Sequence, residues 1–292
     1  MNAKVNMPVV TSSFPVRRMD FDFNDISRYW FGGDAGLTHF MTAMSALFPE
    51  GEQFFVDSVR AVRYHPLLKD NAQLQKEISA FIGQEAMHSK EHEAFNDHAT
   101  KYGHNMARLE KLTRSFIDLK RFFKGFEVEA VNLSATCALE HFTSTIAAEL
   151  MRRSDLQAQI NDPTMYKLWM WHAVEENEHK AVAFDVYQTL YGRGVKAYVL
   201  RTTGMVAATV LILIAQTYFM STLMRKDGLG LRHWGRALNT MYGRNGFFTN
   251  MLPEFADYFR PSFHPNDHDS TALLADWKNK LTFLNVKPQA SR

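Results

Sequence analysis

Two copies of the pattern Glu-x-x-His lie 91 residues apart in this chain and constrain its fold more than any other feature. The first copy pairs Glu85 with His88, and the second pairs Glu176 with His179. Residues three positions apart lie on one face of an α-helix, so each copy points a carboxylate and an imidazole in the same direction. A single copy would be typical of a charged helix surface. The repeat instead favours helices that turn these side chains toward a common centre.

A lone glutamate precedes each copy at a similar distance. Glu52 lies 33 residues before Glu85, and Glu140 lies 36 residues before Glu176. Both halves of the chain therefore have the same order, with a glutamate on one helix and Glu-x-x-His on the next. The sequence around Glu140, "CALEHFTSTIAAEL", is weakly polar, and an exposed glutamate would be unusual there. Four glutamates pointing into a helical core would be too costly to bury unless a cation compensates their charge.

This order resembles the ferritin-like di-iron carboxylate superfamily, in which two helices of a four-helix bundle each give a glutamate and the other two each give Glu-x-x-His. The resemblance implies two divalent metal ions as cofactors. Carboxylate oxygen and imidazole nitrogen suit divalent iron and manganese, so iron is the preferred metal, with manganese or a mixed iron–manganese pair as alternatives. The predicted metal ligands are Glu52, Glu85, His88, Glu140, Glu176 and His179.

Two further histidines lie close to these motifs. His92 is one helical turn beyond His88, and His172 is four residues before Glu176. Each is either an additional ligand or a residue that hydrogen-bonds to a ligand, and the spacing does not decide between the two roles. Glu178 has no matching offset and is expected to face solvent.

Two neighbouring glutamates compete with the predicted ligands. Glu52 is preferred to Glu50 because it follows the helix break expected at residues 49–51. Glu176 is preferred to Glu175 because it alone has the three-residue offset to a histidine.

The hydrophobic pattern is helical almost throughout residues 35–225, with little of the alternation typical of strands. The predicted fold is therefore all-α: a ferritin-like four-helix bundle with additional helices and a long apolar helix on the C-terminal side. Residues 1–34 form an N-terminal arm, residues 35–225 the metal-binding domain with the apolar helix, and residues 226–292 a tail that packs on the bundle. Prolines and glycines mark the breaks. The expected helices span 35–48, 51–65, 68–102, 106–125, 127–153, 163–192 and 195–225, with a short one near 271–283.

Residues 204–224 form an apolar stretch with no charged residue. A membrane-spanning helix needs roughly 20 such residues, but a helix buried by protein on all sides has the same composition. Three acidic residues at 20–25 interrupt any apolar run typical of a secretory signal, and the single Cys137 fits a reducing compartment. We therefore expect a cytoplasmic protein, and the sequence leaves open an association with a membrane surface through 204–224.

The charge balance gives no sign of a nucleic-acid partner, because 33 Lys and Arg residues stand against 31 Asp and Glu residues. The 23 phenylalanines and 15 methionines instead indicate a thick apolar interior or a site for a hydrophobic small molecule. The sequence does not decide whether the protein is a monomer or a homodimer.

The combined motifs are similar to those of a bacterial family of predicted metal-dependent hydrolases, over roughly residues 40–285. They are "FPxGExFF", "GQExxHSxEH", "ALEHFT" and "WHxxEExEHKxVAFDVY", and the "FHP" at 263–265 fits the tail. The resemblance implies a metal-dependent hydrolase with a dinuclear site. The ligand set, however, resembles that of di-iron enzymes that use O2.

The surroundings of the motifs favour the second of these reactions. A hydrolytic two-metal site activates water and usually lies in an open, polar cleft, whereas these ligands are expected at mid-helix positions among Phe, Trp, Met and Ala. We therefore expect a di-iron oxidase or oxygenase that acts on a hydrophobic substrate, such as a lipid or acyl chain, and that receives electrons from a donor protein. Metal-dependent hydrolysis is the alternative. Non-catalytic metal storage or ferroxidase activity is the third and least favoured interpretation.

Overall fold

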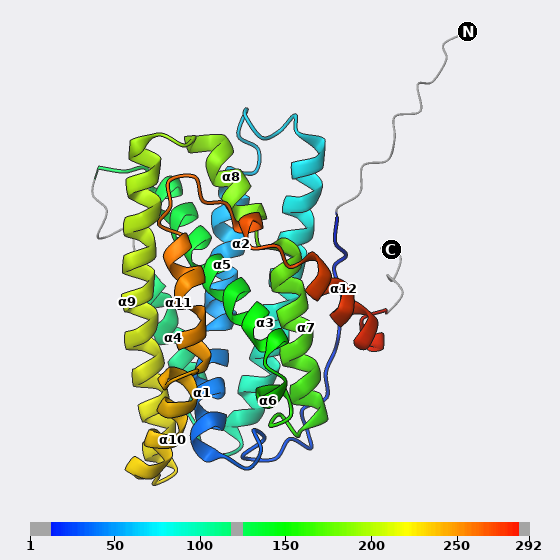
Figure 1. Cartoon of the computed structure of the whole chain (residues 1–292), viewed down its shortest axis with the longest axis vertical. Helices are drawn as coiled ribbons and strands as arrows, with labels where there is room; N and C mark the ends of the chain where they lie inside the picture. The colour runs from blue at the N-terminus through cyan, green and yellow to red at the C-terminus, as the bar shows by residue number, and fades with distance from the viewer. Residues whose placement is uncertain (1–12, 118–124, 286–292) are drawn as a thin grey trace.

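The described part of the chain is helical. A computed structural model describes residues 13–117 and 125–285, and within them only an isolated bridge between Phe31 and Ile160 has strand-like pairing. Figure 1 shows most of the helices running side by side along the long axis of the molecule. The all-α prediction is confirmed.

Four helices pack together as the bundle that carries the predicted ligands. They are α2 (Phe48–Val62), α3 (Ala72–Thr100), α5 (Val128–Arg152) and α7 (Pro163–His179). α2 packs on α3, α5 packs on α7, and further contacts join α2 to α5 and α3 to α7. Short polar caps fix two of the helix starts: Asn71 accepts from the Leu74 amide, and Asp162 accepts from the amides of Thr164 and Met165.

Two predicted helix boundaries near the site are wrong. The expected break at residues 49–51 does not exist, because α2 begins at Phe48 and Pro49 lies in its first turn, where a missing amide hydrogen costs nothing. The single helix expected at 163–192 is instead two helices, α7 and α8 (Val182–Tyr191). The chain turns at Lys180, and the Lys180 ammonium group donates to the Ser270 hydroxyl of the tail at 3.0 Å.

The other expected helices are present, with bounds in the described residues that differ from the expected ones by a few residues. α1 spans Ala35–Ser45, α4 spans Met106–Ile117, and a short α6 (Ser154–Gln157) follows α5. The part of the expected helix 106–125 that covers residues 118–124 lies outside the described residues.

The tail contains more helix than expected. Besides α12 (Thr271–Lys280), it forms α10 (Leu231–Tyr242) and α11 (Phe247–Asp257), together with two short 3₁₀ turns, Pro265–Asp267 and Thr282–Asn285. Gly235 and Pro253 weaken the helical pattern of α10 and α11, but both helices bury apolar side chains. α10 packs on α1, α11 on α5, and α12 on α5 and α7. The division of the chain at residues 34 and 225 stays a prediction.

The long apolar helix α9 (Val195–Lys226) lies along one edge of the molecule (Figure 1). It packs on α1, α4 and α5. α9 and α5 approach closely at Gly204, where a Cβ atom would lie 2.9 Å from the Ser134 hydroxyl and would force that side chain to shift. Within the described residues, α9 is the one helix long and apolar enough to cross a membrane, and 33% of its most apolar window is buried. Protein therefore does not cover it on all sides.

Candidate metal centre

The six predicted ligands lie together in the centre of the bundle. α2 contributes Glu52, α3 contributes Glu85 and His88, α5 contributes Glu140, and α7 contributes Glu176 and His179. None of the six is more than 2% exposed. Residues 124 positions apart in the chain, such as Glu52 and Glu176, thus meet in one buried cluster.

One end of the cluster is centred on the His179 ring. Its Nε2 atom lies 2.8 Å from Glu85 Oε1, 3.4 Å from Glu140 Oε2 and 3.7 Å from Glu176 Oε1. His179 Nε2 and Glu85 Oε1 are close enough for an ion pair, but their geometry is not that of a hydrogen bond. Among the described residues, His179 Nε2 and both Glu85 carboxylate oxygens therefore have no hydrogen-bond partner. The donor atoms of Glu85, Glu140 and His179 are close enough to hold one cation.

The other end is centred on the His88 ring. Its Nδ1 atom lies 3.4 Å from Glu176 Oε1 and 3.9 Å from Glu85 Oε2. Glu85, His88 and Glu176 form a second group that could hold a cation, and Glu52, His88 and His172 form a third. Because Glu85 and His88 each belong to two groups, the groups are parts of one continuous site.

Unsatisfied donor atoms show that this cluster fits a metal. Both carboxylate oxygens of Glu52, Glu85 and Glu140 are buried without a hydrogen-bond partner among the described residues, as is His88 Nδ1. Burying one such atom without a hydrogen-bond partner normally costs about 1–3 kcal/mol of folding stability. Carboxylate oxygens and imidazole nitrogens that converge in this way are the donors that divalent iron, manganese and zinc accept. The residues present therefore fit divalent cations.

The titration behaviour of the metal-free cluster points the same way. Burial, and then repulsion from Glu85 and Glu176, raise the pKa of Glu140 to about 8 against the attraction of His179. Burial lowers the pKa of His88, but the nearby carboxylates of Glu175 and Glu176 raise it to about 10. Burial also raises the pKa of Glu52 well above its ordinary value. Each of these three groups holds its proton more tightly than in water, as expected where several carboxylates converge.

His172 touches the cluster, and His92 lies one residue further out. His172 Nε2 is 3.0 Å from Glu176 Oε1 and 3.6 Å from Glu52 Oε1. Its Nδ1 atom pairs with His92 Nε2 at 2.7 Å, and His92 Nδ1 pairs with the Ser45 hydroxyl at 2.8 Å. Burial, and then the nearby His88, lower the pKa of His172 to about 4, which keeps its ring neutral. His172 is thus placed to act as a ligand, and His92 to orient His172.

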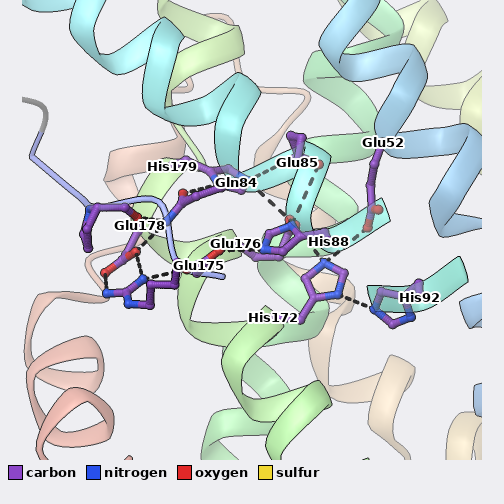
Figure 2. A network of polar contacts seen from close by, with 12 residues as sticks. Glu52, Gln84, Glu85, His88, His92, His172, Glu175, Glu176, Glu178 and His179 are labelled. Carbon is purple, nitrogen blue, oxygen red and sulfur yellow. Dashed lines mark hydrogen bonds and ion pairs between the residues drawn. The ribbon is translucent and has the colours of Figure 1, made fainter. Parts of the chain in front are cut away.

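A second group of polar residues surrounds the cluster and was not predicted (Figure 2). Glu175 Oε2 lies 3.0 Å from His88 Nε2, and Gln84 Oε1 lies 2.9 Å from His179 Nδ1. His88 and His179 therefore each have one ring nitrogen facing the cluster and the other held by a side chain outside it. Such partners fix the orientation of the ring and the nitrogen that carries the proton.

Arg17 of the N-terminal arm joins these outer residues. Its guanidinium donates to Glu175 at 2.8 Å and to both oxygens of Glu178 at 2.8 and 2.9 Å. Glu178 in turn accepts from Gln84 at 2.9 Å and lies 2.7 Å from the Lys278 ammonium. The prediction that Glu178 faces solvent is wrong, because its side chain is 1% exposed. Gln84, Glu175 and Glu178 are each next to a predicted ligand in the sequence, and this adjacency could have indicated them. Nothing in the spacing pointed to Arg17.

A cavity of about 140 Å³ reaches the cluster at Glu52. It lies between α2, α4, α5 and α9, with side chains of α1, α10 and α11 at its edges. Glu52 is its only charged lining residue within the described chain. Apolar side chains form most of the wall, among them Phe48, Phe55, Phe142, Ile146 and Leu211.

Comparison with known proteins gives one match. A family model described as "Predicted metal-dependent hydrolase" matches residues 15–269, a range that contains all six predicted ligands and Arg17. No curated protein and no solved structure matches the chain. The match agrees with the hydrolase alternative of the sequence analysis and does not support the expected oxidase. The ferritin-like resemblance stays a prediction.

Proposed function

The chain belongs to the family of predicted metal-dependent hydrolases, and we propose that its metal-dependent reaction is the oxidation of an apolar substrate by O2 at a dinuclear centre. The observation that carries the proposal is the closure of the site. Its six donor residues are at most 2% exposed, and the cavity that reaches them is apolar except at Glu52 and a few hydroxyl and amide groups.

Six residues would hold the metals: Glu52, Glu85, His88, Glu140, Glu176 and His179, with His172 as a further donor. Iron bound there would supply electrons to O2 and a site for its reduction. In an oxygenase reaction, one oxygen atom enters a C–H bond of the substrate. The other leaves as water, with two electrons and two protons that an electron-donor protein and solvent supply.

The chain itself contributes binding, orientation and the exclusion of water. Phe48, Phe55 and Phe142 offer apolar surface to a hydrocarbon substrate beside Glu52. The same lining favours O2, which partitions into apolar surroundings, and keeps bulk water from the reacting atoms. Glu175 and Gln84 hold the His88 and His179 rings with one nitrogen toward the centre.

Metal-dependent hydrolysis is the second candidate, and the family description favours it. The same donors could bind zinc or manganese, which would then lower the pKa of a water molecule and polarise an ester or amide carbonyl. A hydrolytic substrate would have to bring its polar bond to the one charged end of the cavity, at Glu52. Metal storage is less favoured, because a cavity lined by phenylalanines offers no path for hydrated cations.

Metal loading followed by exposure to O2 separates these functions. Protein purified without air is loaded with Fe(II), Mn(II) or Zn(II), analysed for metal content, and then assayed for O2 uptake and for hydrolysis of acyl esters. We expect about two iron ions per chain and O2 uptake that depends on iron. Glu140→Gln should lose at least one ion, whereas Glu93→Gln, on the exposed face of α3, should bind as the wild type does. Ester hydrolysis with zinc or manganese and no O2 uptake with iron would replace the oxidase by the hydrolase.

A further inference from the structure

One face of α9 is apolar and exposed along most of the helix. The exposed fractions of its large side chains range from 37% to 54%, and no charged residue occurs between 202 and 224. From the rise per residue of a helix, this face extends about 30 Å. Exposed apolar side chains on a soluble protein are normally scattered singly and do not form so long a continuous row. We call it the α9 face: Val199, Val206, Val210, Leu213, Ile214 and Tyr218.

The opposite side of α9 is fixed to the bundle. Gln216 donates to the Phe40 carbonyl at 2.8 Å, and Arg201 donates to the Arg260 carbonyl at 3.0 Å. Both side chains are buried. With polar anchors on this side, α9 cannot cross a bilayer by itself while it remains packed on the bundle. Any contact with a membrane is therefore made lengthwise by the α9 face.

Basic residues lie at both ends of this face. Arg193 and Lys196 are at its start, and Arg225 and Lys226 are at its end. All four are exposed, and none pairs with an acidic side chain in the part of the chain that the structure describes. Two copies of the chain packed through this face would bring cations together in either orientation, so the charge pattern disfavours a second copy as its partner.

The helix α10 lies near the C-terminal end of α9 (Figure 1), and its exposed side chains are of the same kinds. It exposes Leu231 at 88%, Leu238 at 42% and Tyr242 at 41%, together with Arg232. A helix that combines exposed apolar side chains with cations is typical of the interface of a bilayer with anionic lipids.

The cavity beside the metal cluster opens toward this surface. Leu213 of the α9 face and Tyr242 of α10 both line the cavity, and both are partly exposed. A hydrocarbon chain that enters between them would pass apolar side chains up to Glu52.

We propose that the α9 face and α10 dock on a bilayer that contains anionic lipids, and that the cavity accepts the end of an acyl chain from it. The docking surface is inferred from the exposed apolar side chains and the basic residues that flank them. The acyl chain as substrate rests on the proposed function.

Sedimentation of the full-length protein with vesicles tests the docking surface. We expect binding to phosphatidylcholine vesicles containing phosphatidylglycerol, at least tenfold weaker binding to phosphatidylcholine alone, and weakening by salt. The double variant Val210→Glu/Ile214→Glu should lose at least tenfold in binding, and Arg225→Gln/Arg232→Gln should lose the preference for phosphatidylglycerol. Leu67→Glu is the matched control, because Leu67 is 59% exposed in the α2–α3 connection, and should bind as the wild type does.

Two outcomes would overturn the docking surface. One is wild-type protein that stays in the supernatant with every vesicle composition, or that binds no better than Val210→Glu/Ile214→Glu. The other is a lipid-free dimer that the same double variant converts to a monomer, which would assign the face to a second copy. Neither measurement depends on turnover, so a failure of the O2 assay leaves this test intact.

A variant of Gly51 tests the cavity separately. Gly51 lines the cavity, and a Cβ atom there would meet nothing within 4 Å among the residues that the structure describes. Gly51→Leu should therefore fold, fill the cavity and weaken the binding of a fluorescent 18-carbon fatty acid at least tenfold, while vesicle binding is unchanged. Equal binding of the fatty acid by the variant and the wild type would rule out the cavity as the acyl site. The assay needs no metal, so its result is independent of whether the enzyme proves to be an oxidase or a hydrolase.

Discussion

Glu175 Oε2 lies 3.0 Å from His88 Nε2, while Nδ1 of the same ring faces Glu85 and Glu176. Two glutamates adjacent in sequence thus contact different nitrogens of one imidazole. Glu176 is placed among the donors of the cluster, and Glu175 holds the ring from outside. This arrangement gives Glu175 a positioning role that can be tested apart from the ligands themselves.

Glu175→Gln should weaken metal binding without removing a ligand. The amide is a weaker acceptor than the carboxylate and can present its NH₂ group to the ring, which disfavours the orientation that points Nδ1 inward. Loss of such a partner typically costs 10–100-fold in metal affinity. Competition with a chromophoric chelator measures the change, with Glu93→Gln as the control. A similar loss on Glu93→Gln would mean that the effect is not specific to the His88 contact.

Arg17→Ala should release the N-terminal arm and also reduce metal retention. Arg17 pairs with Glu175 and Glu178, whose carboxylates are almost fully buried, so its loss leaves Glu175 with His88 and Glu178 with Lys278 as the remaining cationic partners that the structure describes. We expect faster proteolysis of the arm and a metal content below that of the wild type. Arg18→Ala is the matched control, because Arg18 is exposed. A variant with normal metal content would show that the arm only covers the site.

The metal-free protein should lose stability as the pH rises above 7. Glu140, with a pKa of about 8 against an ordinary 4.5, and His88, with about 10 against 6.5, both hold protons more tightly when the chain is folded. Buried histidines with a lowered pKa, such as His172, have the opposite effect, but only below about pH 6.5, where the unfolded state takes up their protons. Above pH 7 the folded state therefore binds more protons than the unfolded state, and the free energy of unfolding falls with increasing pH. The contribution of Glu140 is lost by about pH 8, and that of His88 by about pH 10.

Urea unfolding of metal-free protein at pH 7, 8 and 9 measures this fall. Glu140→Gln should reduce its slope between pH 7 and 8, because the amide does not titrate. Metal binding should reverse the fall, since bound cations replace the protons and bind more tightly as the ligands lose them. A free energy of unfolding that rises from pH 7 to pH 9 in the metal-free protein would contradict the prediction.

The sequence predicted the residues of the inner cluster but not those around it. A ligand is fixed by a local rule, the three-residue offset on one helix face, and Glu85, His88, Glu176 and His179 obey it. The local sequence pattern around Glu178 is compatible with a surface position. Its side chain is buried because Arg17 and Lys278, which are distant in sequence, pair with it. The helices α10 and α11 were missed for a related reason. Gly235 and Pro253 lower their local propensity, and contacts with α1 and α5 override it.

Two glycines near α10 should respond to alanine in opposite directions. A Cβ atom at Gly36 would lie 2.5 Å from the His233 carbonyl oxygen, so Gly36→Ala must push α10 away from α1. Overpacking of this kind typically costs about 1–3 kcal/mol. Gly235 lies within α10 and a Cβ atom there meets nothing within 4 Å, so Gly235→Ala should stabilise the helix by about 0.5–1 kcal/mol. Thermal unfolding of the two variants beside the wild type measures both effects, and a lower melting temperature for Gly235→Ala would show that α10 is not a regular helix in solution.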